Sequence, residues 1–387
     1  MTNLEFKDKV IYILSQDKWG KMLFSKHHYA IELGKMGNKV FFINFDHSNR
    51  QLTESIGVHE TEYEDVFVVN IKSPVSYFVY REKRTLYNFF IKPLIKKVVK
   101  NLKYPPDLIW SFDLYNSLPI KYFSTEVPKI FFPVDGPFSG QPLLAAEGAD
   151  LIISVTNEIL NGYTHLNTKK IFLNHGVAEE FINATVSQTI NMPLRIGYSG
   201  CFVTSDIDHK TILYLVKKHT ALQFEFFGEY DYNNSSIHLP QNIPVEIKAF
   251  VDELKTLPNV KLHGVVATAE LAKALKQMDL LLVCYNNKKN QSQGTNSHKL
   301  LEYLGSGKVV VSSKMKTYIN EYPGWLMMPG KDSDEDICLL FEKVLNDLKQ
   351  YNSIDEQKKR VAFAEKFTYP NQIRKIEFML NEINSQK

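Results

Sequence analysis

Residues 291–313, QSQGTNSHKLLEYLGSGKVVVSS, bring together residue types that could bind a phosphorylated ligand. A polar loop with a glycine leads into a predicted helix at Asn296 or Ser297, and both are residue types that favour helix N-caps. The N–H groups and the positive dipole end of such a helix suit an anion. Lys299 adds a cation in the first turn, where the dipole alone disfavours one. This placement therefore indicates an anionic ligand.

Glu302 follows Lys299 by three residues, which places both side chains on one face of the predicted helix. Its carboxylate could accept hydrogen bonds from ribose hydroxyls. The alternative is an ordinary capped helix that carries a surface Lys–Glu pair. If the pair binds a ligand, its removal should weaken binding but leave the melting temperature nearly unchanged, because an exposed pair contributes about 1 kcal/mol or less.

Two further candidates follow strands in the first half of the chain. In FFPVDGPFSG, Asp135 comes directly after a buried strand, at the end where α/β proteins bind ligands. It could orient or deprotonate a substrate hydroxyl, or it could cap a helix or begin a turn. Trp19 and Gly20 follow the first predicted strand. Gly20 allows a ligand to approach closely, and Trp19 either stacks on a sugar or covers the core.

Composition narrows the class of protein. The 387 residues include 46 basic and 43 acidic side chains, a net charge of +3 that does not favour nucleic-acid binding. The three cysteines, Cys201, Cys284 and Cys338, are far apart, odd in number and without metal-ligand spacing. We therefore expect neither a zinc site nor a disulfide framework, and a reducing compartment. No apolar run is long enough to span a membrane or to act as a signal segment. These features predict a cytoplasmic protein.

Residues 81–103, REKRTLYNFFIKPLIKKVVKNLK, contain eight basic residues and one acidic residue. Apolar residues interleave with them: Phe89, Phe90, Ile91, Leu94, Ile95, Val98 and Val99. A basic amphipathic helix of this kind can lie on an anionic membrane, here on its inner face. The alternative is a solvated helix whose apolar side packs on the core.

The elements that must position these residues alternate between strand and helix along the whole chain. Apolar runs such as KVIYIL, KVFFINF and LIISV are typical of parallel strands buried on both faces. A helix follows the first run, and Gly37 is placed as its C-cap. The pattern lapses after Ala184 and restarts at Leu194. We therefore predict an N-terminal Rossmann-like domain over residues 1–185, a linker over 186–193, a second Rossmann-like domain over 194–370, and a C-terminal helix, 371–387, that packs back on the first domain.

The second half resembles the donor domain of GT-B glycosyltransferases of the retaining family 4 type. The resemblance rests on four segments in order: RIGYSGCF, FEFFGEY, LPNVKLHGVVATAELAKALKQMDLLLVCY and NSHKLLEYLGSGKVVVSS. They span residues 194–328. The first half resembles the acceptor domain more loosely, through residues 17–44 and 151–181.

This resemblance implies an α/β fold of two Rossmann-like domains that face each other across a cleft. It implies a glycosyltransferase, with retention, that uses a nucleotide diphosphate sugar and a glycan or lipid-linked acceptor of polysaccharide biosynthesis, without a cofactor or metal. Asp135, Lys299 and Glu302 are the predicted catalytic residues, and Trp19 and Gly20 the predicted acceptor-binding residues. In the donor site, Lys299 and the amides of Asn296 and Ser297 would bind the diphosphate, and Glu302 the ribose. The predicted donor-binding set is Gly200, Lys210, Gly228, Val265, Tyr285, Asn296, Ser297, His298, Lys299 and Glu302.

The chain departs from the family pattern at several positions. Gly294 stands where many members have a second glutamate, and Ser297 where proline is common. Lys210 could replace a phosphate-binding cation of the family, or it could lie in solvent beside a helix capped by Asp206 or Asp208. Two other functions remain open: a sugar-nucleotide epimerase of the same fold, and an inert glycan-binding scaffold.

Overall fold

The computed structural model describes residues 5–20, 23–46, 55–136, 140–182, 186–187, 189–232, 243–286, 295–330 and 336–385. The chain forms two compact units, residues 1–174 with 369–387, and residues 175–368. The first boundary lies earlier than the predicted end of the N-terminal domain at residue 185. Residues 175–182 pack in the second unit instead, because Phe181 and Ile182 surround Gly305 of that unit. Gly294 lies outside the described residues.

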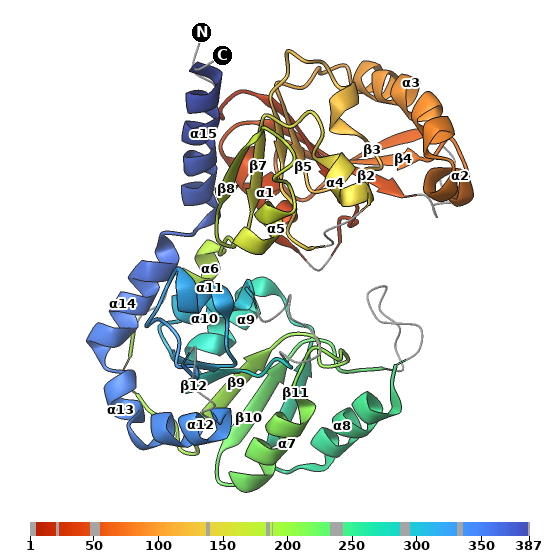
Figure 1. Cartoon of the computed structure of the whole chain (residues 1–387). Helices are drawn as coiled ribbons and strands as arrows, with labels where there is room; N and C mark the ends of the chain where they lie inside the picture. Colours follow the sequence, from red (N-terminus) through yellow and green to blue (C-terminus); the bar gives the residue numbers. More distant parts are fainter. Residues whose placement is uncertain are drawn as a thin grey trace. The chain divides into compact units, whose positions relative to one another are not determined.

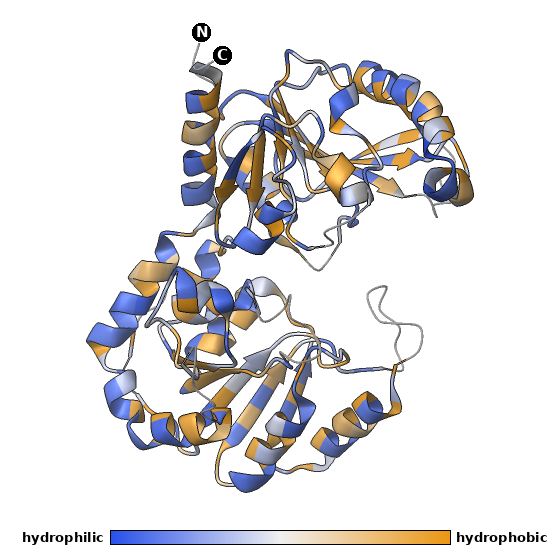
Figure 2. Ribbon diagram, in the orientation of Figure 1, coloured by the Kyte–Doolittle hydropathy of each residue, from blue (hydrophilic) through white to orange (hydrophobic). Residues whose placement is uncertain are grey.

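Unit 1 is built on an eight-stranded sheet of order β3-β4-β2-β1-β5-β6-β7-β8. All of its pairings are parallel except the antiparallel pairing of β3 with β4. Its strands are β1 (Val10–Ser15), β2 (Lys39–Asp46), β3 (Ile56–Glu60), β4 (Val66–Lys72), β5 (Leu108–Ser111), β6 (Lys129–Phe131), β7 (Leu151–Ser154) and β8 (Lys169–Phe172). The central strands, such as β5 and β7, are apolar and buried on both faces, and Figure 2 draws much of them in orange, because helices cover them. The edge strands β3 and β8 are partly exposed.

The helices of unit 1 are α1 (Ser25–Lys35), α2 (Tyr77–Glu82), α3 (Arg84–Leu102), η1 (Ile120–Tyr122), α4 (Gln141–Ala145), α5 (Asn157–Asn161) and α15 (Tyr369–Ser385). Helix α1 ends as its sequence predicts, since Gly37 follows it with φ of 86°. Helix α15 returns to unit 1, where Tyr29 contacts Tyr369. Figure 1 shows it beside β8.

Unit 2 carries a five-stranded parallel sheet of order β11-β10-β9-β12-β13. The strands are β9 (Arg195–Ser199), β10 (Gln223–Phe227), β11 (Val260–Gly264), β12 (Leu280–Val283) and β13 (Val309–Ser312). The strand order reverses between β9 and β12. In open α/β sheets, ligands bind beyond the carboxyl ends of the strands at such a reversal.

The helices of unit 2 are α6 (Glu179–Ile182), α7 (His209–Lys218), α8 (Val245–Thr256), α9 (Thr268–Lys276), α10 (Lys299–Gly305), α11 (Lys316–Asn320), α12 (Ile337–Asn346), α13 (Leu348–Tyr351) and α14 (Ile354–Glu365). The apolar pattern of the sequence predicts one helix over about 333–351, but Asp347 separates α12 from α13. The apolar run WLMM predicts a strand over 325–328, but the structure has only a single bridge there, between Val311 and Met327.

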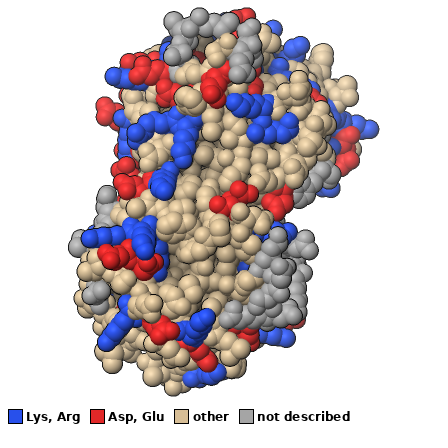
Figure 3. Space-filling view, turned by 60° about the vertical axis from the view of Figure 1, so that its left-hand side comes forward, with Lys and Arg blue, Asp and Glu red and all other residues tan. Residues whose placement is uncertain are grey.

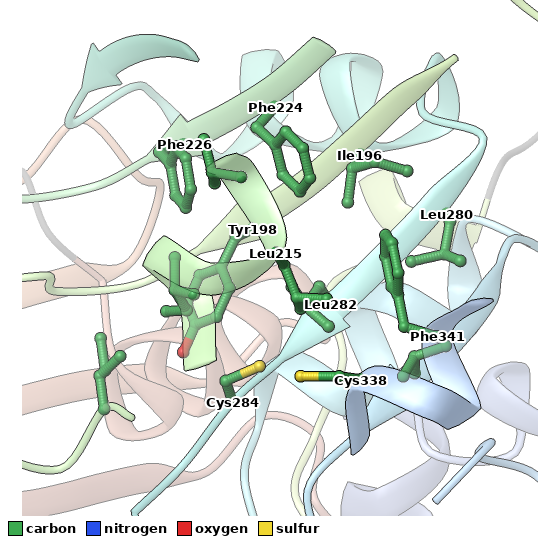
Figure 4. Close-up of a cluster of buried hydrophobic side chains, with 14 of the residues drawn as sticks. Ile196, Tyr198, Leu215, Phe224, Phe226, Leu280, Leu282, Cys284, Cys338 and Phe341 are labelled. Atoms are coloured by element: carbon green, nitrogen blue, oxygen red, sulfur yellow. The ribbon is translucent and has the colours of Figure 1, made fainter. Parts of the chain in front are cut away.

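The core of unit 2 lies between the sheet and the helices α7, α8 and α12. Phe224, Phe226 and Leu282 of the sheet pack against Leu215 of α7 and Phe341 of α12, all at most 4% exposed. Figure 4 shows these side chains between the strands and α12. This core fixes the strand ends that carry the candidate donor site.

Candidate functional site

Two glycines meet where β9 and β10 end. Gly200 and Gly228 have φ of 140° and 133°, a backbone region that side-chain-bearing residues rarely adopt. The N–H of Gly200 donates to the carbonyl of Phe227 over 2.8 Å. A Cβ on Gly228 would overlap the carbonyl oxygen of Gly200. Only glycine therefore allows the two loops to lie this close at the edge of the sheet.

Lys299 is buried, which corrects the expectation of a surface lysine. Its side chain is 7% exposed, and its Nζ donates to the carbonyl of Ser199 over 2.8 Å. The same Nζ lies 5.2 Å from the ring centroids of both Tyr198 and Tyr285. A Cβ on Gly200 would come within 2.5 Å of it. Lys299 thus occupies the space that the missing side chain of Gly200 leaves open.

Helix α10 holds the last residue of β9 from two sides. Lys299 and Tyr303, one helical turn apart, both contact Ser199. The N–H of Ser199 donates to Tyr303 Oη over 2.6 Å, and the Ser199 hydroxyl lies 3.1 Å from the same oxygen. Sequence reasoning missed Tyr303 and Ser199, although Tyr303 stands beside Glu302 in a matched segment. Lys299 therefore also has a structural role, which the sequence-based prediction had excluded.

Glu302 is partly exposed, and its carboxylate titrates at a raised pH. Burial raises its pKa from 4.5 to about 7, and the Lys299 charge only partly opposes this effect. Within the described residues, no donor makes a hydrogen bond to the Glu302 carboxylate, and Lys299 bonds Ser199 instead of pairing with it. The two side chains therefore do not form the surface Lys–Glu pair that the alternative interpretation requires. A shifted carboxylate with unused acceptor capacity is typical of a functional site.

The segment before α10 differs from the predicted helix start. The helix begins at Lys299, with His298 at the N-cap position, and neither Asn296 nor Ser297 caps it. The Ser297 N–H donates to the side chain of Asn296 over 2.8 Å, so this amide is already occupied. The Ser297 hydroxyl lies 3.1 Å from Tyr285 Oη. Asn296, Ser297 and Tyr285 are buried, and His298 is exposed.

Besides His298, two more members of the predicted donor set are exposed. Val265, directly after β11, is 55% exposed. Lys210 is exposed in the first turn of α7, where Asp208 is the N-cap and accepts from the Thr211 N–H over 3.2 Å. This geometry corresponds to the alternative in which Asp208 caps the helix and Lys210 lies in solvent. The structure brings Gly200, Tyr285, Ser297 and Lys299 together, but it gives Lys210 no contact with them.

In unit 1, Asp135 lies beyond β6 and is exposed. Although the residue as a whole is exposed, desolvation of its carboxyl group raises its pKa. The nearby Lys26 charge opposes this rise, and the Asp17 charge adds to it. Lys26 is 5% exposed and forms an ion pair with Asp17, which follows β1. Asp135 is thus next to a charged pair at the carboxyl edge of the sheet.

Trp19 packs edge-on against its neighbours. Its ring centroid lies 5.0 Å from that of Phe42, 5.3 Å from His27 and 6.1 Å from Tyr63. This packing corresponds to the alternative in which Trp19 covers the core. Gly20 is exposed, and a Cβ built on it would meet no atom within 4 Å. The fold itself therefore does not require glycine at this position.

The described residues contain no group of three or more His, Cys, Asp or Glu side chains arranged to hold a metal ion. They also contain no helix that is long and apolar enough to cross a membrane.

The chain matches no family model, and no curated protein has a matching sequence. It does resemble solved structures along its length. A sucrose-phosphate synthase from Thermosynechococcus elongatus superimposes with a TM-score of 0.65 at 13% identity, covering 98% of each chain. Anabaena HepE in complex with UDP and glucose gives 0.63 at 13% identity over 98% of each chain. A glycosyltransferase from Rickettsia africae gives 0.63 at 13% identity over 98% of this chain and 100% of its own. The protein therefore has the GT-B fold, with two Rossmann-like units.

Proposed function

We propose that this protein transfers a sugar from a nucleoside diphosphate sugar to a carbohydrate acceptor. The observation that carries the proposal is the carboxylate of Glu302, partly buried, with a pKa of about 7 and no hydrogen bond from the described residues. It stands beside Lys299 at the strand-order reversal of a GT-B fold. A ligand with vicinal hydroxyls and a diphosphate would satisfy both side chains.

Within this proposal, Glu302 accepts hydrogen bonds from the ribose and Lys299 neutralises the diphosphate. Lys299 has three N–H donors, and the carbonyl of Ser199 accepts from its Nζ. Glycines 200 and 228 let the two loops and the Lys299 ammonium lie together at the strand ends, because a Cβ on either would overlap the Lys299 Nζ or the Gly200 carbonyl. UDP is the first nucleotide to test, since Anabaena HepE was solved with UDP and glucose.

A nucleotide panel tests the donor site. Calorimetric titration of the full chain with UDP, GDP, ADP and dTDP should give binding by at least one of them, with UDP the first candidate. Absence of binding by all four at millimolar concentration would refute the proposal and favour an inert scaffold. A ligand that binds only the folded protein also raises its melting temperature, so a thermal-shift panel provides a second readout.

The reaction itself needs separate evidence. We propose transfer with retention to a glycan or lipid-linked acceptor of polysaccharide assembly, with Asp135 of unit 1 acting on the acceptor hydroxyl. Product analysis with and without acceptor distinguishes this transferase from an epimerase, which would convert the donor without an acceptor. We also propose that the donor binds without a metal, so UDP affinity should be the same with and without EDTA. A loss of binding with EDTA would contradict this last point.

A second proposal is attachment to anionic membranes through α2 and α3. Part of the predicted apolar stripe is not available for this: Ile91, Leu94, Ile95 and Val98 are buried in unit 1. The structure exposes a different set of apolar side chains, namely Tyr77 (57%), Phe78 (61%), Leu86 (47%), Phe89 (73%) and Phe90 (39%). Three of these apolar residues, Leu86, Phe89 and Phe90, lie on α3. The same helix carries the exposed lysines Lys92, Lys96, Lys97 and Lys100. On the face drawn in Figure 3, by contrast, acidic and basic side chains are interspersed.

Liposome sedimentation tests this second proposal. Changing Lys96, Lys97 and Lys100 to glutamine should weaken binding to anionic vesicles by about 1 kcal/mol per charge near the surface. The matched control changes three exposed lysines of unit 2, Lys343, Lys349 and Lys358, and should bind as the wild type does. Wild-type protein that stays in the supernatant at low salt would show that α3 is only a solvated, core-packing helix.

A further inference from the structure

Two cysteines in unit 2 face each other within the core. Cys284 follows β12 and is fully buried, whereas Cys338 is the second residue of α12 and is 8% exposed. Both belong to the same cluster of buried side chains. Figure 4 shows the two sulfur atoms turned toward one another across the contact between the strand end and α12.

The backbone on both sides of this contact is anchored. The carbonyl of Cys284 accepts from the N–H of Asp208 over 3.0 Å, which ties it to the N-cap of α7. The N–H of Cys338 donates to the Asp336 side chain over 2.8 Å, which fixes the first turn of α12. The two thiols are therefore held as neighbours although 53 residues separate them in the sequence. A disulfide needs this kind of pre-alignment of its Cβ atoms.

We propose that Cys284 and Cys338 are a reversible disulfide site, oxidised by a low-molecular-weight disulfide such as oxidised glutathione. The Cys338 thiol loses its proton and attacks one sulfur of the oxidant, which releases one glutathione thiolate. The Cys284 thiolate then attacks the Cys338 sulfur of the mixed disulfide, and the second glutathione thiolate leaves. The protein gives up two protons and two electrons, and the oxidant becomes two thiols.

Cys338 is the attacking thiol because it is the more exposed of the two. Burial raises the pKa of Cys284 well above its usual range, and burial together with the Asp336 carboxylate raises that of Cys338 to about 12. Because the thiolate is the nucleophile, the reaction is slow in the closed structure. It proceeds when the first turn of α12 opens, and it should accelerate as the pH rises.

The bond would join α12 to the segment that carries Tyr285, whose ring lies against Lys299. It closes a loop of more than 50 residues. Such a cross-link stabilises the folded state mainly by restricting the unfolded chain. The oxidised protein should therefore melt at a higher temperature than the reduced protein.

The test uses the full chain with Cys201→Ser, which removes the exposed thiol of the loop after Gly200. Incubation with oxidised glutathione at pH 8.5 should lower the intact mass by about 2 Da, the loss of two hydrogens. A non-reducing digest should yield one linked peptide containing Cys284 and Cys338. The melting temperature should rise by about 8–16 °C, and dithiothreitol should reverse all three changes.

The control, Cys201→Ser with Cys284→Ser, carries Cys338 alone and should show neither the mass loss nor the rise in melting temperature. Two thiols that still titrate after unfolding of the treated Cys201→Ser protein would overturn the proposal. So would glutathione adducts on Cys338 that never resolve to the intramolecular bond. None of these readouts depends on nucleotide binding, so this site is tested independently of the proposed transfer.

Discussion

Replacing Glu302 by glutamine should stabilise the ligand-free protein at alkaline pH. Burial raises the pKa of this carboxyl from 4.5 to about 7, and each pKa unit corresponds to about 1.4 kcal/mol. Keeping the carboxylate ionised in the folded state therefore costs about 3 kcal/mol above pH 7. Glutamine has nearly the same shape and no charge, so the variant avoids this cost.

The sign of the pH dependence follows from proton binding. The folded protein binds more protons than the unfolded chain between pH 4.5 and about 7. The stability associated with Glu302 is complete below pH 4.5 and is lost as the pH rises through 7. Between pH 5.5 and 8.5 the advantage of the Glu302→Gln variant should grow by about 2 kcal/mol. For a unit of roughly 200 residues this is a relative gain of about 4–8 °C in melting temperature.

The assay is thermal unfolding by circular dichroism at both pH values, without ligand, beside titration with UDP. Glu302→Gln should bind UDP about 10-fold more weakly than wild type at pH 8.5, because an ionised acceptor makes the stronger hydrogen bond. Glu302→Ala should lose more affinity. The control Glu270→Gln, on an exposed residue of α9, should change neither quantity. A Glu302→Gln variant that melts lower than wild type at pH 8.5 and binds UDP equally well would refute this reasoning.

Three other outcomes follow from the geometry. Lys299→Ala should lower the melting temperature by several degrees, because it removes a charged hydrogen bond worth about 1.5–3 kcal/mol. The same variant should bind UDP about 10- to 150-fold more weakly. An unchanged melting temperature would show that the hydrogen bond to Ser199 does not stabilise the protein. Gly228→Ala should destabilise unit 2, because its Cβ would overlap the Gly200 carbonyl, whereas the control Gly20→Ala should be as stable as wild type. If a denaturant titration gave the two variants equal stability, the close contact between Gly200 and Gly228 would be contradicted. Asp135→Asn should leave UDP affinity unchanged, but with donor and acceptor both present it should form UDP about 100-fold or more slowly. A variant with full activity would show that Asp135 takes no part in the mechanism.

The parallel strands could be predicted because helices cover both faces of each sheet, which demands continuous apolar runs. KVFFINF and DLLLVCY are such runs, and they form β2 and β12. Strand β3 was missed because it is an antiparallel edge strand, and its last three residues are exposed. Without the apolar run or a strict alternation, residues 56–60 resemble a loop in sequence. The division of the long helix after Asn346 was missed for a related reason, since the apolar pattern continues across Asp347.

The sequence by itself determined which residues stand at the strand ends and that Lys299 and Glu302 share a helix. Local patterns suffice for this, because strand and helix periods are properties of neighbouring residues. Only the tertiary structure decided that Lys299 is buried and that Glu302 carries a raised pKa. The partner of Lys299, Ser199, lies 100 residues away in the sequence. Burial and pKa depend on atoms that the fold brings together, and no spacing within the segment 291–313 reports where those atoms are.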